Sequence, residues 1–219
     1  MIRVKILVEG QTEETFVRDV LAPYYARQQI FVTPIIVLTS PGNKGGVTNY
    51  GKVRRQLIRF CRQDQGAVIT TMFDLYRLPV DFPGRQDAAY PANGNGEQKA
   101  AFLEDRMAAD IGEDNFIPYL SVHEFEALLF VAPEKFSDWI DDEEPIEQLR
   151  QIRAQAGGLP EQINDSPNTA PSKRILALVP HYKKPLHGPL IAEDIGLDAM
   201  RQACPHFNAW LQRLEQLAI

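Results

Sequence analysis

Short apolar runs alternate with helical segments over about the first 130 residues, and this alternation restricts the fold more than any other feature. Residues 2–8 form a nearly continuous, β-branched run that is typical of a buried strand. Further strands are predicted over residues 31–38, 67–73 and 116–122, and helices after Thr12, after Gly51 and over residues 97–111. Such alternation predicts an α/β fold with a mostly parallel sheet of about four strands and helices on both faces.

Local signals add detail to this prediction. Thr12 is suited to cap the first helix, and Pro34 within the second strand favours an edge position. After Pro133 the pattern changes to short helical segments separated by proline and glycine, with no convincing strand. We therefore divide the chain into an α/β domain, residues 1–132, and a helical C-terminal subdomain, residues 133–219, packed on it. The aromatic residues of the second part are expected in the core: Phe136, Trp139, Phe207 and Trp210.

Charge and composition exclude several classes of protein. The net charge of −6, from 29 acids and 23 bases, argues against a protein that coats nucleic acid without specificity. It does not exclude a nuclease, because bound cations neutralise an acidic metal site. Two cysteines, Cys61 and Cys204, cannot build a disulfide framework, and no apolar stretch reaches the roughly 18 residues of a membrane helix. We expect a cytoplasmic protein with reduced thiols and no membrane contact.

Carboxylates follow three of the predicted strands. Glu9 ends the first strand, Asp74 follows the third, and Glu124 and Glu126 follow the fourth, while Glu13 lies in the first turn of the first helix. Ligands bind at the carboxyl ends of the strands in open α/β sheets, so these five side chains are expected to converge. Oxygen ligands of this kind suit hard cations. The sequence therefore predicts an Mg²⁺ or Mn²⁺ site.

Basic residues form two groups that are candidates for substrate contacts. Lys44, Lys52 and Arg55 lie in or after a glycine-rich loop, and we expect them to bind phosphate groups. The spacing from Gly46 to Lys52 fits a phosphate-binding loop, but Val53 follows where Ser or Thr would hold Mg²⁺, so we do not predict a nucleotide hydrolase. A second group in the C-terminal part comprises Ser172, Lys173, Arg174, His181, Lys183, Lys184 and His187. One lysine of that group is expected to stabilise charge on a phosphate.

The segment Val8-Glu9-Gly10-Gln11-Thr12-Glu13 resembles the opening motif of Toprim domains, in particular that of the old-type (overcoming lysogenization defect) Toprim nucleases. The whole chain is similar to the family called domain of unknown function 4276. That similarity rests on the Glu9 segment and on further motifs: Phe73-Asp74-Leu75-Tyr76, Asp81-Phe82-Pro83-Gly84, His123-Glu124-Phe125-Glu126, Pro171-Ser172-Lys173-Arg174 and Cys204-Pro205-His206-Phe207.

The Toprim resemblance implies roles for single residues. Glu9 matches the glutamate that serves as metal ligand or acid/base, and Glu13 matches the second acid of the nuclease branch. The Asp-x-Asp motif is matched at Asp74 only, because Tyr76 occupies its second position, and Asp81 is a candidate replacement. Glu124 and Glu126 resemble the later paired acids. The resemblance also implies a partner ATPase and a role in phage defence.

These observations lead to one leading function and one alternative. The leading function is a metal-dependent phosphodiesterase, a nuclease that acts on DNA or RNA, with Glu9, Asp74 and Lys173 as catalytic residues. Lys44, Lys52, Arg55 and Lys183 would then bind the nucleic acid. The alternative is a non-catalytic Toprim-like subunit that binds or regulates an ATPase complex. The replacement at Tyr76 favours the alternative, and the retained acids favour the enzyme.

Overall fold

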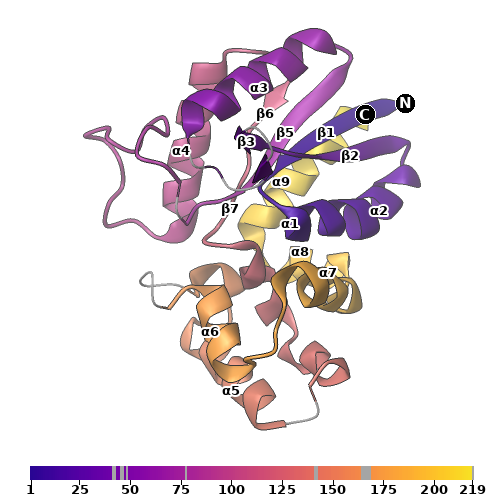
Figure 1. Cartoon of the computed structure of the whole chain (residues 1–219), viewed down its shortest axis with the longest axis vertical. Coiled ribbons are helices and arrows are strands. Elements are labelled where there is room, and N and C mark those ends of the chain that lie inside the picture. The colour runs from indigo at the N-terminus through magenta and orange to yellow at the C-terminus, as the bar shows by residue number, and fades with distance from the viewer. Residues whose placement is uncertain are drawn as a thin grey trace.

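The computed structural model describes residues 1–40, 43–44, 47, 49–76, 78–140, 143–163 and 169–218 (Figure 1). The strands are β1 (Ile2–Val8), β2 (Ile30–Ile36), β3 (Leu38–Ser40), β4 (Asn43–Lys44), β5 (Ala67–Asp74), β6 (Phe116–Ile117) and β7 (Leu120–Ser121). The α-helices are α1 (Gln11–Phe16), α2 (Ala22–Ala26), α3 (Tyr50–Gln63), α4 (Gly96–Ile111), α5 (Glu143–Gln155), α6 (Pro171–Leu178), α7 (Lys184–Ile195), α8 (Leu197–Ala203) and α9 (Pro205–Glu215). A π-helical turn, η1 (Val17–Leu21), joins α1 to α2, and the 3₁₀ turns are η2 (Phe125–Val131), η3 (Pro133–Asp138), η4 (Pro160–Gln162) and η5 (Gln216–Ala218).

The central sheet is parallel, which confirms the predicted α/β fold. Its strands follow the order β2-β1-β5-β6, and β7 also pairs with β5. The strand that carries Pro34 lies at an edge, as predicted. The predicted strand 116–122 is broken into β6 and β7 around Pro118, and Thr71 Oγ1 bridges the break by hydrogen bonding both Tyr119 N and Tyr119 O.

The two faces of the sheet carry separate apolar clusters, because neighbouring residues of a strand point to opposite sides. Ile6 packs in a cluster with α1, η1 and α9, which includes Phe16. Leu7 packs in the other cluster with α3 and α4, which includes Leu57 and Leu103. The helices that follow β1 and β2 thus cover different faces, so the chain changes face between β1 and β5. In open α/β sheets, such a switch point opens a crevice at the carboxyl ends of the strands.

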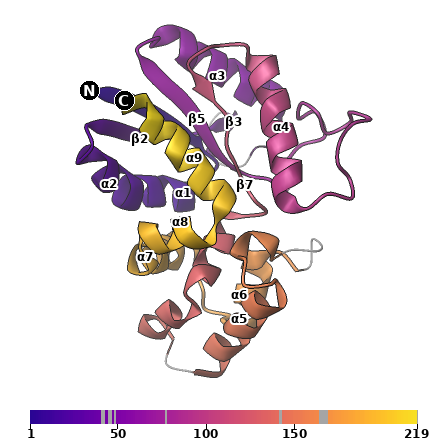
Figure 2. The ribbon, with the colours of Figure 1, turned by 180° about the vertical axis from the view of Figure 1, so that it is seen from behind.

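Helices from the second part of the chain cover those carboxyl ends. Figure 1 shows α5, α6 and α7 as a layer beside the sheet, on the side where α1 begins. The last helix, α9, returns to the sheet and crosses one of its faces (Figure 2). There Trp210 Nε1 donates a 3.0 Å hydrogen bond to Thr70 Oγ1, and the Trp210 ring stacks on Tyr119 at 4.1 Å.

Buried polar groups fasten the start of α9. Glu161 accepts hydrogen bonds from the backbone N–H groups of His206 and Phe207, at 3.0 and 2.9 Å. The His206 ring lies 2.9 Å from Glu104 of α4, and Glu104 also accepts from Leu120 N. This network ties the helical part of the chain to the sheet, since its members come from α4, η4, α9 and β7.

Further predictions from the sequence concern the buried aromatic residues, the cysteines, membrane-spanning helices and the domain boundary. Phe136, Phe207 and Trp210 are buried as predicted, but the prediction for Trp139 is wrong because its side chain is exposed. Both cysteines are free and buried. Within the described part of the chain, no helix is both long enough and apolar enough to cross a bilayer. The division of the chain near residue 133 stays a prediction.

Candidate functional site

Glu9 and Asp74 meet at the switch point of the sheet. β1 and β5 are adjacent parallel strands, with Val8 opposite Met72, so the residues that end them are neighbours. Glu9 Oε1 accepts a 2.8 Å hydrogen bond from Asp74 N. Asp74 Oδ1 in turn accepts a 3.0 Å hydrogen bond from Phe125 N, in the segment that follows β7. The predicted convergence of these two acids is therefore seen in the structure.

Glu13 joins them from the first turn of α1. Its Oε2 accepts a 2.9 Å hydrogen bond from Gly10 N, the residue that caps the helix. The prediction that Thr12 caps this helix is wrong, because the N-cap is Gly10, two residues earlier, and the carboxylate of Glu13 accepts from the Gly10 N–H. Glu13 is buried, and its charge lies near the positive end of the helix dipole.

Glu124 and Glu126 reach the site from the segment after β7. His123 turns the chain there with a φ of 69°, a left-handed conformation that costs energy for a residue with a side chain. Glu124 Oε2 accepts a 2.9 Å hydrogen bond from Ser172 N at the start of α6. Glu126 is only 2% exposed, and its Oε1 lies 3.1 Å from Lys184 Nζ of α7.

The electrostatics show that the five acids form one cluster. Burial, followed by the charge of Glu13, raises the pKa of Glu9 to about 8. Burial and the charges of Glu9 and Glu13 raise the pKa of Asp74 well above its ordinary range. Burial also raises the pKa of Glu13, and it raises that of Glu126 to about 7 although the Lys184 ammonium opposes the shift. The cluster thus holds more buried negative charge than its neighbours compensate.

Two further residues, Tyr182 and Lys184, join the cluster from the segment that starts α7. The sequence predicted Lys184 only as one member of the second basic group, and it did not predict Tyr182. Burial lowers the pKa of Lys184, but the carboxylates of Glu126 and Glu124 outweigh it, so the net pKa is raised. The Tyr182 hydroxyl is buried near the same acids, and burial together with the charge of Glu126 raises its pKa. A basic pair at 183–184 beside a tyrosine was visible in the sequence, but nothing there shows which side chains point inward.

The remaining predicted site residues lie elsewhere or have other partners. Lys173 and Lys183 are exposed, on α6 and just before α7, and the lysine that contacts the cluster is Lys184. Lys52 and Arg55 are exposed on α3, whereas the side chain of Lys44 lies outside the described residues. Asp81 accepts hydrogen bonds from Tyr50 N and Gly51 N, so it caps α3 and does not replace the missing acid at Tyr76.

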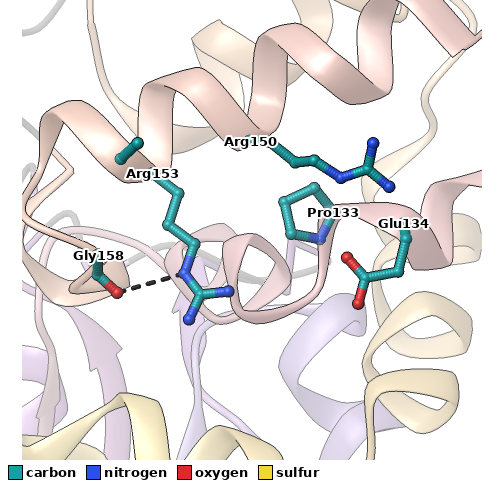
Figure 3. A pocket seen from close by; sticks show the side chains of 6 residues that line it. Pro133, Glu134, Arg150, Arg153 and Gly158 are labelled. Carbon is teal, nitrogen blue, oxygen red and sulfur yellow. Dashed lines mark hydrogen bonds between the residues drawn. The ribbon is translucent and has the colours of Figure 1, made fainter.

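A cavity of about 340 Å³ lies away from the five acids, along α5. Figure 3 shows Arg150 and Arg153 reaching toward it from the helix, with Pro133 and Glu134 on the other side. Arg153 donates hydrogen bonds to Gly158 O at 3.2 Å and to Val131 O at 2.5 Å. Its guanidinium therefore joins the end of α5 to the end of η2. These contacts explain the position of Arg153, and no bound ligand is needed to explain it.

Comparisons with known proteins give one match. The model of the family described as "Domain of unknown function (DUF4276)" matches residues 8–215. The match begins at the end of β1 and ends in α9, so it includes all five clustered acids, Tyr182 and Lys184. Neither the curated proteins nor the solved structures that were compared include a match to the chain.

Proposed function

The chain belongs to the family described as domain of unknown function (DUF4276), and from its carboxylate cluster we propose that it is a divalent-metal-dependent phosphodiesterase that cleaves nucleic acid. One observation carries the proposal. Buried and half-buried acids from three strand ends and from α1 converge at the switch point of a parallel sheet, where α/β proteins bind ligands. The raised pKa values of Glu9 and Glu126 mark these two acids as groups that a structural role alone does not require.

The cluster fits a divalent cation in donor type and charge. All five candidate ligands are carboxylates, the oxygen donors that Mg²⁺ and Mn²⁺ prefer: Glu9, Glu13, Asp74, Glu124 and Glu126. Within the described residues, no three acid, histidine or cysteine side chains already surround one point as ligands. Binding an ion would therefore require some carboxylates to turn away from the backbone N–H groups that they now accept from, such as those of Asp74, Gly10 and Ser172.

Residues of the chain itself would hold the cation and place positive charge beside the phosphate. A bound cation supplies Lewis acidity, which lowers the pKa of a water molecule and neutralises phosphate charge. Lys184, held against Glu126, would place a fixed positive charge beside a phosphoryl oxygen, the role that we first expected of Lys173. Glu9 and Asp74, which end adjacent strands, would be among the carboxylates that hold the cation.

The proposed substrate rests on the exposed basic residues of α3, and the proposed partner rests on the resemblance to old-type Toprim nucleases. Helix α3 begins at the same edge of the sheet as the acids, and its exposed Lys52 and Arg55 would guide a phosphate backbone of DNA or RNA. The similarity of the Glu9 segment to old-type Toprim nucleases supports a Toprim-like domain, a partner ATPase and a role in phage defence. We propose these as one hypothesis with the nuclease activity.

A second candidate is a non-catalytic subunit that regulates such an ATPase. The observation that favours it is Tyr76, which lies where a Toprim enzyme carries its second aspartate, together with the structural role of Asp81 at α3. The two candidates differ in one respect that can be measured, because only the enzyme consumes substrate.

Cleavage of labelled DNA and RNA oligonucleotides with Mg²⁺ or Mn²⁺ tests the proposal. We expect cleavage by the wild type, and loss of at least about 100-fold for Glu9→Gln and Asp74→Asn, which keep the shape of each side chain but remove its charge. Asp105→Asn removes the same charge from an exposed position on α4 and should leave the rate unchanged. If the wild type cuts neither substrate, with or without an ATPase partner, the regulatory function is favoured.

A further inference from the structure

Tyr182 has a buried hydroxyl group without a hydrogen-bond partner in the described part of the chain. The residue is only 5% exposed, and its hydroxyl lies near the carboxylates of Glu126, Glu124 and Glu13. A buried hydroxyl that makes no hydrogen bond costs about 1–3 kcal/mol relative to one that does. Phenylalanine would fill the same space without that cost.

The surroundings of the hydroxyl keep it in this position. The Tyr182 ring is flanked by Phe136 and His187, with ring centres 6.4 and 6.0 Å away. A Cβ atom at Gly188, on the facing turn of α7, would lie 2.9 Å from the Tyr182 hydroxyl oxygen. The glycine therefore leaves the space that the hydroxyl occupies, and a larger residue there would displace the hydroxyl from its present position.

We propose that the Tyr182 hydroxyl contacts the ligand of the carboxylate cluster, by hydrogen bonding an oxygen atom bound to a divalent cation held there. That oxygen belongs either to a water molecule on the cation or to a phosphoryl group of the substrate. The inference rests on the proposed function, because it needs the cluster to hold a cation. It adds a residue of the helical part of the chain to a site otherwise built from strand ends and α1.

Titration calorimetry and thermal melting of Tyr182→Phe test the inference. Without metal, the melting temperature of the variant should equal or exceed that of the wild type, since no hydrogen bond is lost. Its affinity for Mn²⁺, measured either alone or in the presence of a nucleotide, should fall about fivefold, as expected for the loss of one hydrogen bond. Titrations with Mn²⁺ alone and with Mn²⁺ plus thymidine 5′-monophosphate identify the oxygen: a loss in both indicates bound water, and a loss only with the nucleotide indicates a phosphoryl oxygen.

Two further variants make the result specific. Tyr25→Phe removes a buried hydroxyl that already lies 3.4 Å from Glu215, far from the acids, and should not change Mn²⁺ affinity. Gly188→Ala keeps the tyrosine but displaces its hydroxyl, and should weaken Mn²⁺ binding as Tyr182→Phe does. If Tyr182→Phe does not fold, Gly188→Ala still tests whether the Tyr182 hydroxyl contacts the ligand.

Each of the following three outcomes would overturn the inference. If the wild type binds Mn²⁺ and Tyr182→Phe binds it equally well in both titrations, the hydroxyl does not contact the ligand, and the metal-dependent function stands. A lower melting temperature of metal-free Tyr182→Phe would show a structural hydrogen bond instead. If the wild type itself binds no Mn²⁺, the proposed function fails and the inference fails with it.

Discussion

The folded, metal-free protein favours the protonated, neutral form of the Glu9 carboxyl group. It follows an apolar strand, is half-buried beside Glu13, and accepts a hydrogen bond from Asp74 N. Desolvation, followed by the charge of Glu13, raises its pKa to about 8 although the hydrogen bond from Asp74 N opposes the shift, so the folded protein holds a proton that the unfolded chain releases at about pH 4.5. A cation that displaces this proton would gain affinity as the pH rises.

The raised pKa of Glu9 predicts how stability depends on pH in metal-free protein. Between about pH 4.5 and 8 the folded state binds more protons than the unfolded state, so the free energy of unfolding decreases as the pH rises through this range. Glu9→Gln removes that contribution. In the presence of EDTA, we expect its melting temperature to match the wild type at pH 5 and to exceed it at pH 8. Parallel melting curves for the two proteins across this range would contradict the raised pKa.

Single residues also show what the sequence could predict of the site. Glu9, Asp74, Glu124 and Glu126 were predicted because the position of a residue at a strand end follows from the strand itself. The contact of Lys184 with the acids was not, because it depends on how α7 packs against α1 and η2, which no local pattern encodes. The capping role of Asp81 was missed for the same reason, since its partners lie 30 and 31 residues away along the chain.

Helix α3 presents a basic surface beside the proposed site. Two of its arginines form ion pairs, Arg54 with Asp110 and Arg62 with Glu113. Arg55 and Arg59 are exposed and form no ion pair with a described residue. The sequence predicted the helix and its charge, but only the structure separates the arginines that pair with acids from those that do not. The arginines without an ion pair are the ones available to a phosphate backbone.

The role of α3 predicts a change in nucleic-acid binding without a change in stability. The double variant Lys52→Ala/Arg55→Ala should bind oligonucleotides more weakly, and each lost phosphate contact should reduce the slope of log affinity against log salt by about 0.7–0.9. Fluorescence anisotropy at several salt concentrations measures both. Arg27→Ala/Arg213→Ala removes two exposed charges, one just after α2 and one in α9, on the other face of the sheet, and should leave the slope unchanged. Equal slopes for the two double variants would exclude α3 as the binding surface.

At the scale of the whole molecule, the sheet and the helical layer are joined by α9. The sequence predicted β1 and β5 almost to the residue and β2 to within two residues, because each is a short apolar run with its own boundaries, whereas the fourth predicted strand is broken into β6 and β7. It predicted a helix after Pro205 but not its place on the sheet, since the bond from Trp210 to Thr70 spans 140 residues. Contacts over such distances depend on the complete fold and leave no local periodicity.

Glu161 is the acid that fastens α9, and its replacement should affect the stability of the whole protein. Glu161→Ala leaves the buried N–H groups of His206 and Phe207 without their acceptor, at an expected cost of about 2 kcal/mol in the free energy of unfolding. Urea unfolding followed by tryptophan fluorescence measures the loss. Glu161→Gln keeps an acceptor oxygen and should lose less. An alanine variant as stable as the wild type would show that other contacts hold the helix.

The return of α9 to the sheet also has a consequence for synthesis of the protein. A ribosome completes all strands of the sheet by Ser121, but the face that holds Tyr119 and Thr70 stays uncovered until residues 205–215 emerge. This face of the sheet therefore keeps its apolar surface exposed while the helical layer is translated. Nascent chains stalled between these points should bind chaperones, and the acids at the strand ends should reach their final arrangement only after translation has passed α9.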